Sequence, residues 1–351
     1  MPDYQFPTAE SPAIYIIHDN PEWIPPFSAA FEAEGLDLVE WLLPERVLDL
    51  AAAPPEGIFW SRLSASSHTR TDPHIKEYGR AVLAWLEAAG RTVINGAGVY
   101  ELEVSKIRQH RVLANHGFEV PRTVTVFGHT TLVAAAEAFT PPFITKHNQG
   151  GKGLGVRRFD THAEFAAAAG DFAPGGGNEP VDGITLIQEY VQPAEPFITR
   201  AEFIGGAFHY AVKVDVSGGS FELCPADACQ VGQPGIAGAI CSVPGHDHSE
   251  HDAAPETSDA APTPQFQRRE EVTADTPLVV RLTALLAEQN AQLAGVEFIE
   301  TADGRQVVYD INTNTNYNPD VETSEWEAGR LPATRRIAQY LGTTLRSLYQ
   351  S

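Results

Sequence analysis

A predicted β-hairpin near residue 300 constrains the fold of this chain more than any other segment. Two runs of β-forming residues, Val296–Ile299 and Gln306–Ile311, flank the dipeptide Asp303-Gly304. An Asp-Gly pair between two such runs is a strong signal for a tight turn. The sequence therefore predicts two antiparallel strands at this position.

Three oxygen-bearing side chains belong to this hairpin. Asp310 and Asn312 are two residues apart on a strand, so they share a face, and the turn brings Glu297 back opposite them. Two carboxylates and one amide oxygen suit Mg²⁺, which takes oxygen ligands and keeps positions open for water and substrate phosphates. The hairpin alone leaves a second interpretation open, in which these are ordinary polar residues at a strand edge.

Composition indicates a globular protein of two or three domains. The 351 residues are 43% hydrophobic and 20% charged, and no apolar run approaches the length of a membrane span. The N-terminus lacks the basic and apolar regions of a secretory signal. Three cysteines are too few and too clustered for a disulfide framework, so a reducing cytoplasm is expected.

The formal net charge of −22 limits the partners that the protein can attract. A surface this acidic repels nucleic acid and anionic lipid, so neither is an expected partner. A phosphate compound would need local basic side chains, backbone N–H groups or a metal. Isolated basic residues beside glycines are therefore the places to search.

The order of predicted elements divides the chain into two domains. Strand and helix signals alternate over residues 1–104, which predicts an α/β domain with a small parallel sheet. Residues 105–351 show strands in pairs, which predicts an α+β domain. Within it, Pro277–Leu293 is expected to form a helix. Residues 242–265 have no apolar periodicity and no Lys or Arg, and are interpreted as a disordered acidic insertion with no derivable role.

A glycine-rich loop follows a strand that ends in Lys146. Glycines let backbone N–H groups wrap an anion, and the lysine adds a point charge to the same phosphate. The loop does not match the Walker A pattern, and no helix follows it as in a dinucleotide fingerprint. The glycines are Gly150, Gly151, Gly153 and Gly155.

Two further features support a nucleotide site. Lys106 begins a predicted helix, and the buried strand Leu186–Val191 stops shortly before Pro193. The end of such a strand can offer backbone groups to an adenine edge while apolar neighbours stack on the base.

The order of these motifs resembles the ATP-grasp superfamily, and within it the RimK-like, alpha-L-glutamate ligase type. The resemblance covers roughly residues 100–320 and implies an ATP-grasp fold of two lobes after a small α/β domain. It also implies ATP-dependent joining of a carboxylate to an amine through an acyl phosphate. The matching positions are Lys106, Lys146 with its loop, Gln188 to Val191, Arg200, Gly205-Gly206, Lys213, Glu297, Asp310 and Asn312.

The resemblance also implies a role for each matching residue. Lys106 and Lys146 would hold nucleotide phosphates under the loop 148–155, and Arg200 and Lys213 would face the transferred group. The adenine site would use Gln188, Glu189, Tyr190 and Val191, and the ligands of Mg²⁺, with Mn²⁺ as a possible substitute, would be Glu297, Asp310 and Asn312.

The chain departs from the family pattern at three places. His147 stands where many members have proline. Pro196 stands where an acidic residue usually meets the ribose, and Glu195 beside it is the expected substitute. The usual Pro-Gly after Asn312 is replaced by a run rich in asparagine. These departures concern the ribose contact and the acceptor pocket.

A loop in the first domain is a candidate substrate site. Arg62, His68 and Arg70 follow a predicted strand, and arginine can bind a carboxylate through two hydrogen bonds. A solvated connection between elements is the alternative. Asp215 is a candidate general base for the amine, although a solvated strand end is at least as good an explanation.

Two other chemistries find less support in the sequence. Zinc could be held by cysteine and histidine, but the histidines lie in the acidic insertion. A serine hydrolase lacks the Gly-x-Ser-x-Gly elbow. The candidate zinc residues are Cys224, Cys229, Cys241, His246, His248 and His251.

The expected protein is thus an ATP- and Mg²⁺-dependent ligase that uses small carboxylate and amine substrates. A nucleotide-binding regulatory protein and a small-molecule kinase on the same fold are the alternatives. The sequence does not identify the substrates, and it leaves a homo-oligomer possible.

Overall fold

The structure of this chain is a computed structural model. It describes residues 6–44, 47–70, 72–151, 153, 155–218 and 264–349. The candidate zinc residues and the predicted acidic insertion, apart from its last two residues, lie outside these ranges.

The first layer is a small parallel sheet, as the sequence predicts, and its four strands have the order β2-β1-β3-β4. Side chains alternate along its central strands. Ile14 and Ile16 pack on one side with α1 and α9, whereas Tyr15 and Ile17 pack on the other side with α2. The elements are β1 (Ala13–His18), α1 (Pro25–Ala33), β2 (Leu38–Leu42), β3 (Gly57–Arg62), α2 (Ile75–Ala88) and β4 (Thr92–Ile94).

Two short helices connect this sheet to the rest of the chain. Helix α3 (Ala97–Glu103) and helix α4 (Lys106–Asn115) are separated at Ser105, whose side chain caps α4 by accepting from the N–H of Arg108. The predicted boundary between residues 104 and 105 lies at this break and stays a prediction.

The second layer is a four-stranded antiparallel sheet of order β5-β8-β6-β7. Phe143, Phe159, Phe165 and Phe172 fill the core between this sheet and its helices, and the other three rings pack edge to face with Phe165. The elements are β5 (Thr123–Phe127), α5 (Leu132–Ala136), β6 (Phe143–His147), β7 (Arg157–Phe159), α6 (His162–Ala168) and β8 (Ile184–Glu189).

The third layer is a five-stranded antiparallel sheet of order β11-β10-β9-β12-β13, and it contains the predicted hairpin as β12 and β13. Its elements are β9 (Phe197–Ile204), β10 (Ala207–Asp215), β11 (Phe266–Arg268), α7 (Pro277–Glu288), β12 (Leu293–Glu300), β13 (Gln306–Asn312), α8 (Pro319–Glu327) and α9 (Ala333–Tyr349).

Helix α7 is shorter than predicted. It ends at Glu288, and Leu293 begins strand β12 instead of continuing the helix. Asn290 adopts a positive φ of 56°, and the N–H of Ala291 returns to the carbonyl of Leu286. Helices commonly end with a residue in the left-handed conformation, followed by an N–H that bonds back to a carbonyl of the last turn.

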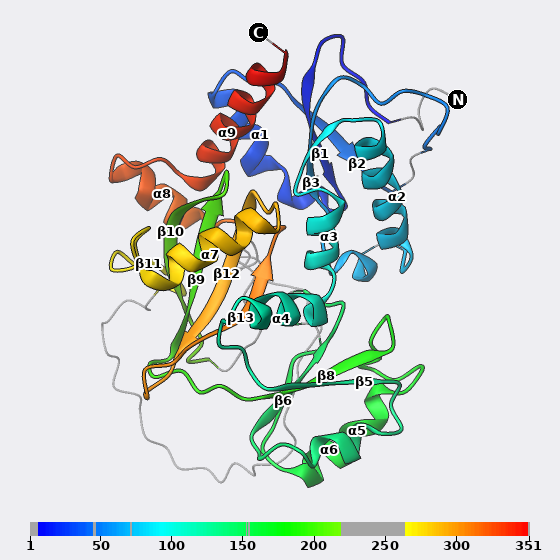
Figure 1. The fold of residues 1–351 in the computed structure, drawn as a ribbon, viewed down its shortest axis with the longest axis vertical. Coiled ribbons are helices and arrows are strands. Elements are labelled where there is room, and N and C mark those ends of the chain that lie inside the picture. The colour runs from blue at the N-terminus through cyan, green and yellow to red at the C-terminus, as the bar shows by residue number, and fades with distance from the viewer. Residues whose placement is uncertain are drawn as a thin grey trace, which may run out of the picture.

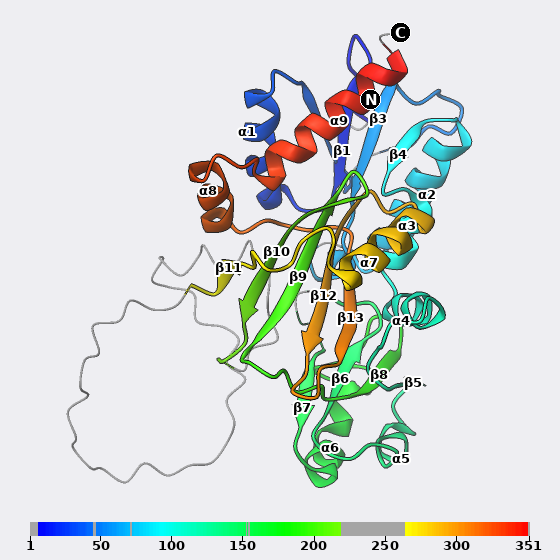
Figure 2. The ribbon, with the colours of Figure 1, turned by 60° about the vertical axis from the view of Figure 1, so that its left-hand side comes forward.

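The three layers stack along the long axis of the molecule (Figure 1). The parallel sheet lies at one end, the β5–β8 sheet at the other, and the five-stranded sheet between them. Helix α9 runs back from the five-stranded sheet to the parallel sheet (Figure 2), where Ile337 and Leu341 join the core formed by α1 and β1. The C-terminal helix therefore fixes the first layer to the third.

Candidate active site

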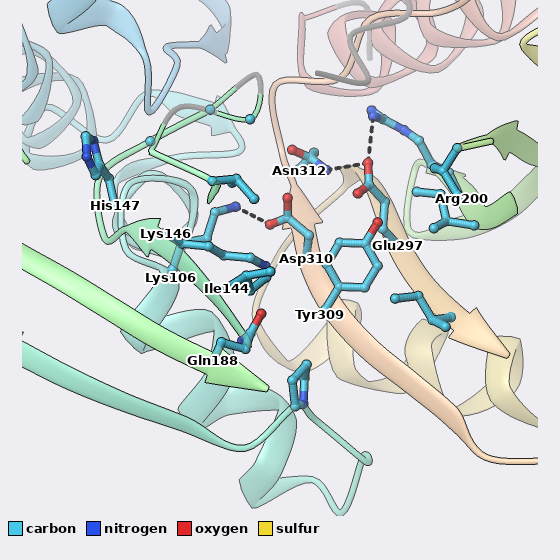
Figure 3. Close-up of a pocket in the computed structure, with 18 of the residues that line it drawn as sticks. Lys106, Ile144, Lys146, His147, Gln188, Arg200, Glu297, Tyr309, Asp310 and Asn312 are labelled. Carbon is cyan, nitrogen blue, oxygen red and sulfur yellow. Dashed lines mark hydrogen bonds and ion pairs between the residues drawn. The ribbon is translucent and has the colours of Figure 1, made fainter. Parts of the chain in front are cut away.

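A cavity of about 340 Å³ lies between the two antiparallel sheets. Strands β6 and β8 form one wall, β12 and β13 the opposite wall, and the loop after β3 closes one end (Figure 3). This volume is at the lower end of the range for small-ligand sites. The fold therefore brings the predicted glycine loop and the predicted metal hairpin to the same cavity.

The hairpin places its three oxygen donors on one face. Glu297 pairs with Asp310, and Gly295 pairs with Asn312. A β-bulge makes this possible: if the register that pairs Phe298 with Val308 continued, Glu297 would face Tyr309. The donors are close together, since Asn312 Nδ2 lies 3.3 Å from Glu297 Oε1.

The donor set fits a hard divalent cation. Two carboxylates and one amide oxygen leave coordination positions for water or phosphate, as Mg²⁺ requires. Cationic side chains already contact both carboxylates: Lys106 Nζ forms an ion pair with Asp310, and Arg200 Nη1 lies 3.2 Å from Glu297 (Figure 3). Among the described residues there is no cluster of three or more His, Cys, Asp or Glu side chains suited to a metal, so the amide is an essential member of this set.

Burial and the neighbouring positive charges have opposite effects on the pKa of each carboxylate. Burial raises the pKa of Glu297 above its usual value, although Arg200 opposes the shift. Burial would also raise the pKa of Asp310, but the ammonium groups of Lys106 and Lys146 hold it below its usual value. Asp310 is therefore ionised at neutral pH and available as a metal ligand.

Lys106 is held at the first turn of α4 by Asn148, which directly follows β6. Its backbone N–H donates to the carbonyl of Asn148, and the Asn148 side chain accepts from Ile107 N at 3.1 Å. Burial works to lower the pKa of Lys106, but Asp310 raises it above the usual value. The lysine therefore keeps its charge.

Lys146 projects from β6 into the same cavity. Its Nζ lies 5.0 Å from the centre of the Tyr309 ring, within cation–π range. Burial lowers the pKa of Lys146 to about 8, although Asp310 acts in the opposite direction. An anionic ligand beside this group would restore the charged form.

The glycine loop lies over the cavity. Gly150, Gly151 and Gly153 line it, whereas Gly155 packs against the His147 ring. A Cβ atom on Gly155 would lie 2.1 Å from His147 Cδ2, and the residue has a positive φ of 72°, so glycine is required there. Lys152 and Leu154 lie outside the described residues.

Another region of the cavity lining combines apolar side chains with the end of β8. The residues predicted to contact adenine all line the cavity: Gln188, Glu189, Tyr190 and Val191. Apolar residues from both sheets complete this region, and the Arg158 guanidinium stacks on the Tyr190 ring at 4.5 Å. The apolar residues are Ile144, Val156, Ile198, Val216 and Ile299.

Two predicted residues lie away from the cavity. Lys213 pairs with Thr199 and so faces away from Arg200, because a β-bulge between Phe208 and Tyr210 shifts the register by one residue. Its Nζ lies 5.7 Å from the centre of the Phe197 ring instead. Glu195 is exposed and does not line the cavity, so the ribose contact remains unassigned.

The three residues predicted to bind substrate do not line the cavity either. Arg62 is 1% exposed and holds the chain after β13. Arg70 pairs with Asp19 at 3.0 Å, and His68 Nδ1 lies 3.0 Å from the ammonium group of Lys76. These contacts organise the first-domain loop. Asp215 is a solvated strand end that accepts from the N–H of Ser217.

Several cavity residues were not predicted from the sequence. Glu103 is buried and accepts from the backbone and hydroxyl of Thr313. Tyr309 became part of the site because it occupies the bulge of the hairpin. Asparagines after Asn312 line the cavity as well. The sequence did mark this segment, because an asparagine-rich run stands there in place of the Pro-Gly pair of the family pattern. Other unpredicted lining residues include Trp23, Ser64, Ser66, Asn314 and Asn316.

Comparison with known proteins supports this description. No family model matches the chain. A "Probable alpha-L-glutamate ligase" of Xanthomonas campestris pv. campestris (strain 8004) is 29% identical over 158 residues, which cover 43% of this chain and 50% of the relative. The chain thus spans about half the length of the curated relatives that it matches.

Solved structures share the architecture over nearly the whole chain. The RimK domain protein ATP-grasp from Sphaerobacter thermophilus has a TM-score of 0.61 and 16% identity, covering 93% of this chain and 98% of that one. The ATP-grasp ligase PsnB, complexed with minimal precursor, Mg and ADP, has a TM-score of 0.57 and 14% identity, covering 95% and 97%.

The parallel sheet and the two antiparallel sheets that enclose the cavity define an ATP-grasp architecture. The chain therefore has the ATP-grasp fold, and part of its sequence is similar to curated alpha-L-glutamate ligases. Among the described residues, no helix is long and apolar enough to cross a membrane.

Proposed function

We propose that this protein is an ATP- and Mg²⁺-dependent ligase that joins a carboxylate to an amine through an acyl phosphate. One observation carries the proposal: two lysines, a glycine loop and three oxygen donors from one hairpin surround a single cavity. A degenerate nucleotide binder has no need to keep this complete set.

The cavity divides into regions that suit the parts of ATP. Apolar side chains and the end of β8 would enclose the adenine, and Lys106 and Lys146 would hold the phosphates beneath the loop. Glu297, Asp310 and Asn312 would hold Mg²⁺, which would neutralise charge on the phosphate oxygens. Arg200 is fixed by Glu202 and Glu297 and would orient the carboxylate to be activated.

The proposed reaction needs only ATP, the carboxylate and the amine as reactants. A carboxylate oxygen attacks the γ-phosphorus, and the bond to the ADP oxygen breaks. The amine nitrogen then attacks the acyl carbon, and the carbon–oxygen bond breaks to release phosphate. The amine loses a proton, so the products are an amide, ADP and phosphate. Catalysis here consists mainly of positioning and charge neutralisation.

The relatives support a ligase of this kind and suggest where to look for substrates. The name of the Xanthomonas relative points to L-glutamate, and the PsnB structure contains a precursor, Mg and ADP. An amino acid, a peptide or another small carboxylate is therefore the proposed substrate class, in a reducing cytoplasm.

Phosphate release from ATP and Mg²⁺, measured with a panel of amino acids and small carboxylates, tests the proposal when mass spectrometry identifies the products. An amide product supports the ligase. A phosphorylated product indicates a kinase, and no product with retained ATP binding indicates a regulatory protein. Asp310→Asn should abolish turnover, whereas Asp303→Asn, at the exposed turn of the same hairpin, is the matched control.

A further inference from the structure

The strand that carries two of the proposed metal ligands lies at the edge of its sheet. Among the described strands, the one neighbour of β13 in this sheet is β12, and helix α4 lies along its other side (Figure 2). Backbone N–H and C=O groups at a buried edge are costly to leave unpaired, so they need partners from outside the sheet. These partners help to fix the conformation of the metal hairpin formed by β12 and β13.

Gln109 of α4 provides the partners at the most sensitive point of this edge. Its Nε2 donates to the carbonyl of Ile311 at 2.7 Å, and its Oε1 accepts from the N–H of Ile311 at 3.2 Å. The side-chain amide thus bonds to Ile311 as the backbone of a neighbouring strand would. Ile311 stands between Asp310 and Asn312, so its backbone position determines theirs.

The remaining hydrogen-bonding positions of the Gln109 amide are occupied as well. Its Nε2 also donates to the carbonyl of Leu102 at 3.0 Å, and its Oε1 accepts from Lys106 Nζ at 3.4 Å. A primary amide has two N–H donors and two acceptor lone pairs, so all four are used. Carbonyls only accept and N–H groups only donate, which leaves the amide one orientation. Gln109 is 1% exposed, so water does not compete for these bonds.

We propose that Gln109 is a positioning residue for the divalent cation of the active site. It fixes the backbone of Ile311 and thereby holds Asp310 and Asn312 in place, without touching the cation itself. Partners behind the ligands of a metal typically change its affinity by about 10- to 100-fold. This inference deepens the proposed function and rests on the metal site proposed there.

Binding of Mn²⁺ to the full-length protein without nucleotide, measured by electron paramagnetic resonance, tests this role. Gln109→Met keeps an unbranched side chain but removes all four hydrogen bonds, so the Kd for Mn²⁺ should rise about tenfold. Gln109→Asn keeps the amide but is one methylene too short to reach all four partners. It should also weaken Mn²⁺ binding, and it provides the test if the methionine variant does not fold.

A control variant separates this role from a general loss of stability. Leu285 of α7 is 1% exposed and belongs to the same hydrophobic core as Ile311, but it does not line the cavity. Leu285→Ala leaves a void in this core and lowers the free energy of unfolding. Because it leaves the Gln109 amide in place, its Mn²⁺ affinity should stay within about twofold of the wild-type value.

The Lys106→Ala background separates two routes by which Gln109 could act. If Gln109 acted only by holding the ammonium group, its replacement would have no effect once that group is absent. Action through the Ile311 backbone predicts that Gln109→Met still weakens Mn²⁺ binding about tenfold in this background. In the otherwise wild-type protein, the Mg²⁺ concentration for half-maximal turnover should rise, while kcat at saturating Mg²⁺ should stay close to the wild-type value.

The outcomes distinguish the positioning role from the proposed function. Unchanged Mn²⁺ affinity in Gln109→Met, an equal loss in Leu285→Ala, or no effect of Gln109→Met in the Lys106→Ala background would overturn the role and leave the ligase standing. Mn²⁺ binding that depends on Gln109, without any amide product, would contradict the ligase and leave the role standing. A wild-type protein that binds no Mn²⁺ would contradict both.

Discussion

Lys106, the first residue of α4, forms an ion pair with Asp310 at the end of β13. The pair joins a proposed phosphate ligand to a proposed metal ligand across the cavity. A divalent cation that binds Asp310 must therefore compete with the ammonium group. Nucleotide phosphates remove this competition, since they offer Lys106 another partner.

Removing the ammonium group should therefore have opposite effects on metal binding and on turnover. In Lys106→Ala, Mn²⁺ without nucleotide should bind more tightly, measured by electron paramagnetic resonance. ATP turnover should fall roughly 10- to 150-fold, since a charged hydrogen bond contributes about 1.5–3 kcal/mol. Lys106→Arg keeps the charge and should leave Mn²⁺ affinity nearly unchanged. Weaker Mn²⁺ binding in the alanine variant would refute the competition.

Lys146 should make ATP binding sensitive to alkaline pH. Because burial lowers its pKa to about 8, the free protein loses this positive charge as the pH rises through that value. The Kd for ATP, measured by calorimetry between pH 7 and about 9.5, should therefore increase. Lys146→Arg stays charged over this range and should give a flat profile. Identical profiles for the two proteins would remove Lys146 from the phosphate site.

The lowered pKa of Lys146 also determines how the free energy of unfolding changes with pH. The folded-state pKa of Lys146 lies below the unfolded value of 10.5, so the unfolded chain binds more protons between these pH values. Burial of the charged lysine thus destabilises the fold below about pH 8, and the cost diminishes as the pH rises toward 10.5. Lys76, whose pKa burial also lowers to about 8, adds to this effect. ATP affinity is therefore the more specific measurement.

Asn148 should control both stability and the position of Lys106. Its Oδ1 accepts from Ile107 N and from Ser105 Oγ, and its Nδ2 donates to Asp182 at 2.7 Å. Asn148→Ala leaves these partly buried groups unsatisfied and should lower the free energy of unfolding by about 1–3 kcal/mol, measured in urea. It should also weaken ATP binding.

Ser105→Ala is the matched control for Asn148. It removes a helix cap next to the same lysine and should cost about 1 kcal/mol. It should change ATP affinity less than Asn148→Ala does. Equal losses of ATP affinity in the two variants would show that α4 stability alone is involved.

Residues 219–263 should be dispensable for catalysis. Strands β10 and β11 are antiparallel neighbours, and Asp215 N donates to the carbonyl of Gln265 at 2.8 Å. A short glycine-rich turn can therefore connect the two strands. A chain shortened in this way should keep ATP turnover within about twofold, and a large loss in a folded variant would contradict the prediction.

The sequence predicted the parts of the site that depend on local pattern. Strand positions, the Asp-Gly turn and the strand that delivers Lys146 follow from residue types over a few positions. The helix that begins at Lys106 was predicted in the same way. These features need no knowledge of distant contacts.

Strand register was harder to predict, because one extra residue exchanges the two faces of a strand. The bulge at Tyr309 places Asp310 opposite Glu297, in agreement with the prediction. The bulge near His209 turns Lys213 away from Arg200, against the prediction. Neither bulge has a clear signal in the sequence.

The role of Arg62 depends on contacts with residues about 250 positions away in the sequence. It is the last residue of β3 in the first domain, but its partners are Asn314 and Asn316. Residue type indicated that Arg62 could bind a carboxylate. Only the fold shows that two amides intervene between this guanidinium and the cavity.

The most direct test of the ligase mechanism follows an oxygen atom. A carboxylate substrate found in the panel is labelled with ¹⁸O in both carboxylate oxygens, and the released phosphate is analysed by mass spectrometry. An acyl phosphate transfers one of these oxygens to phosphate, so each phosphate formed should carry one ¹⁸O atom. Unlabelled phosphate would show that ATP is hydrolysed without activation of the carboxylate, and would contradict the mechanism.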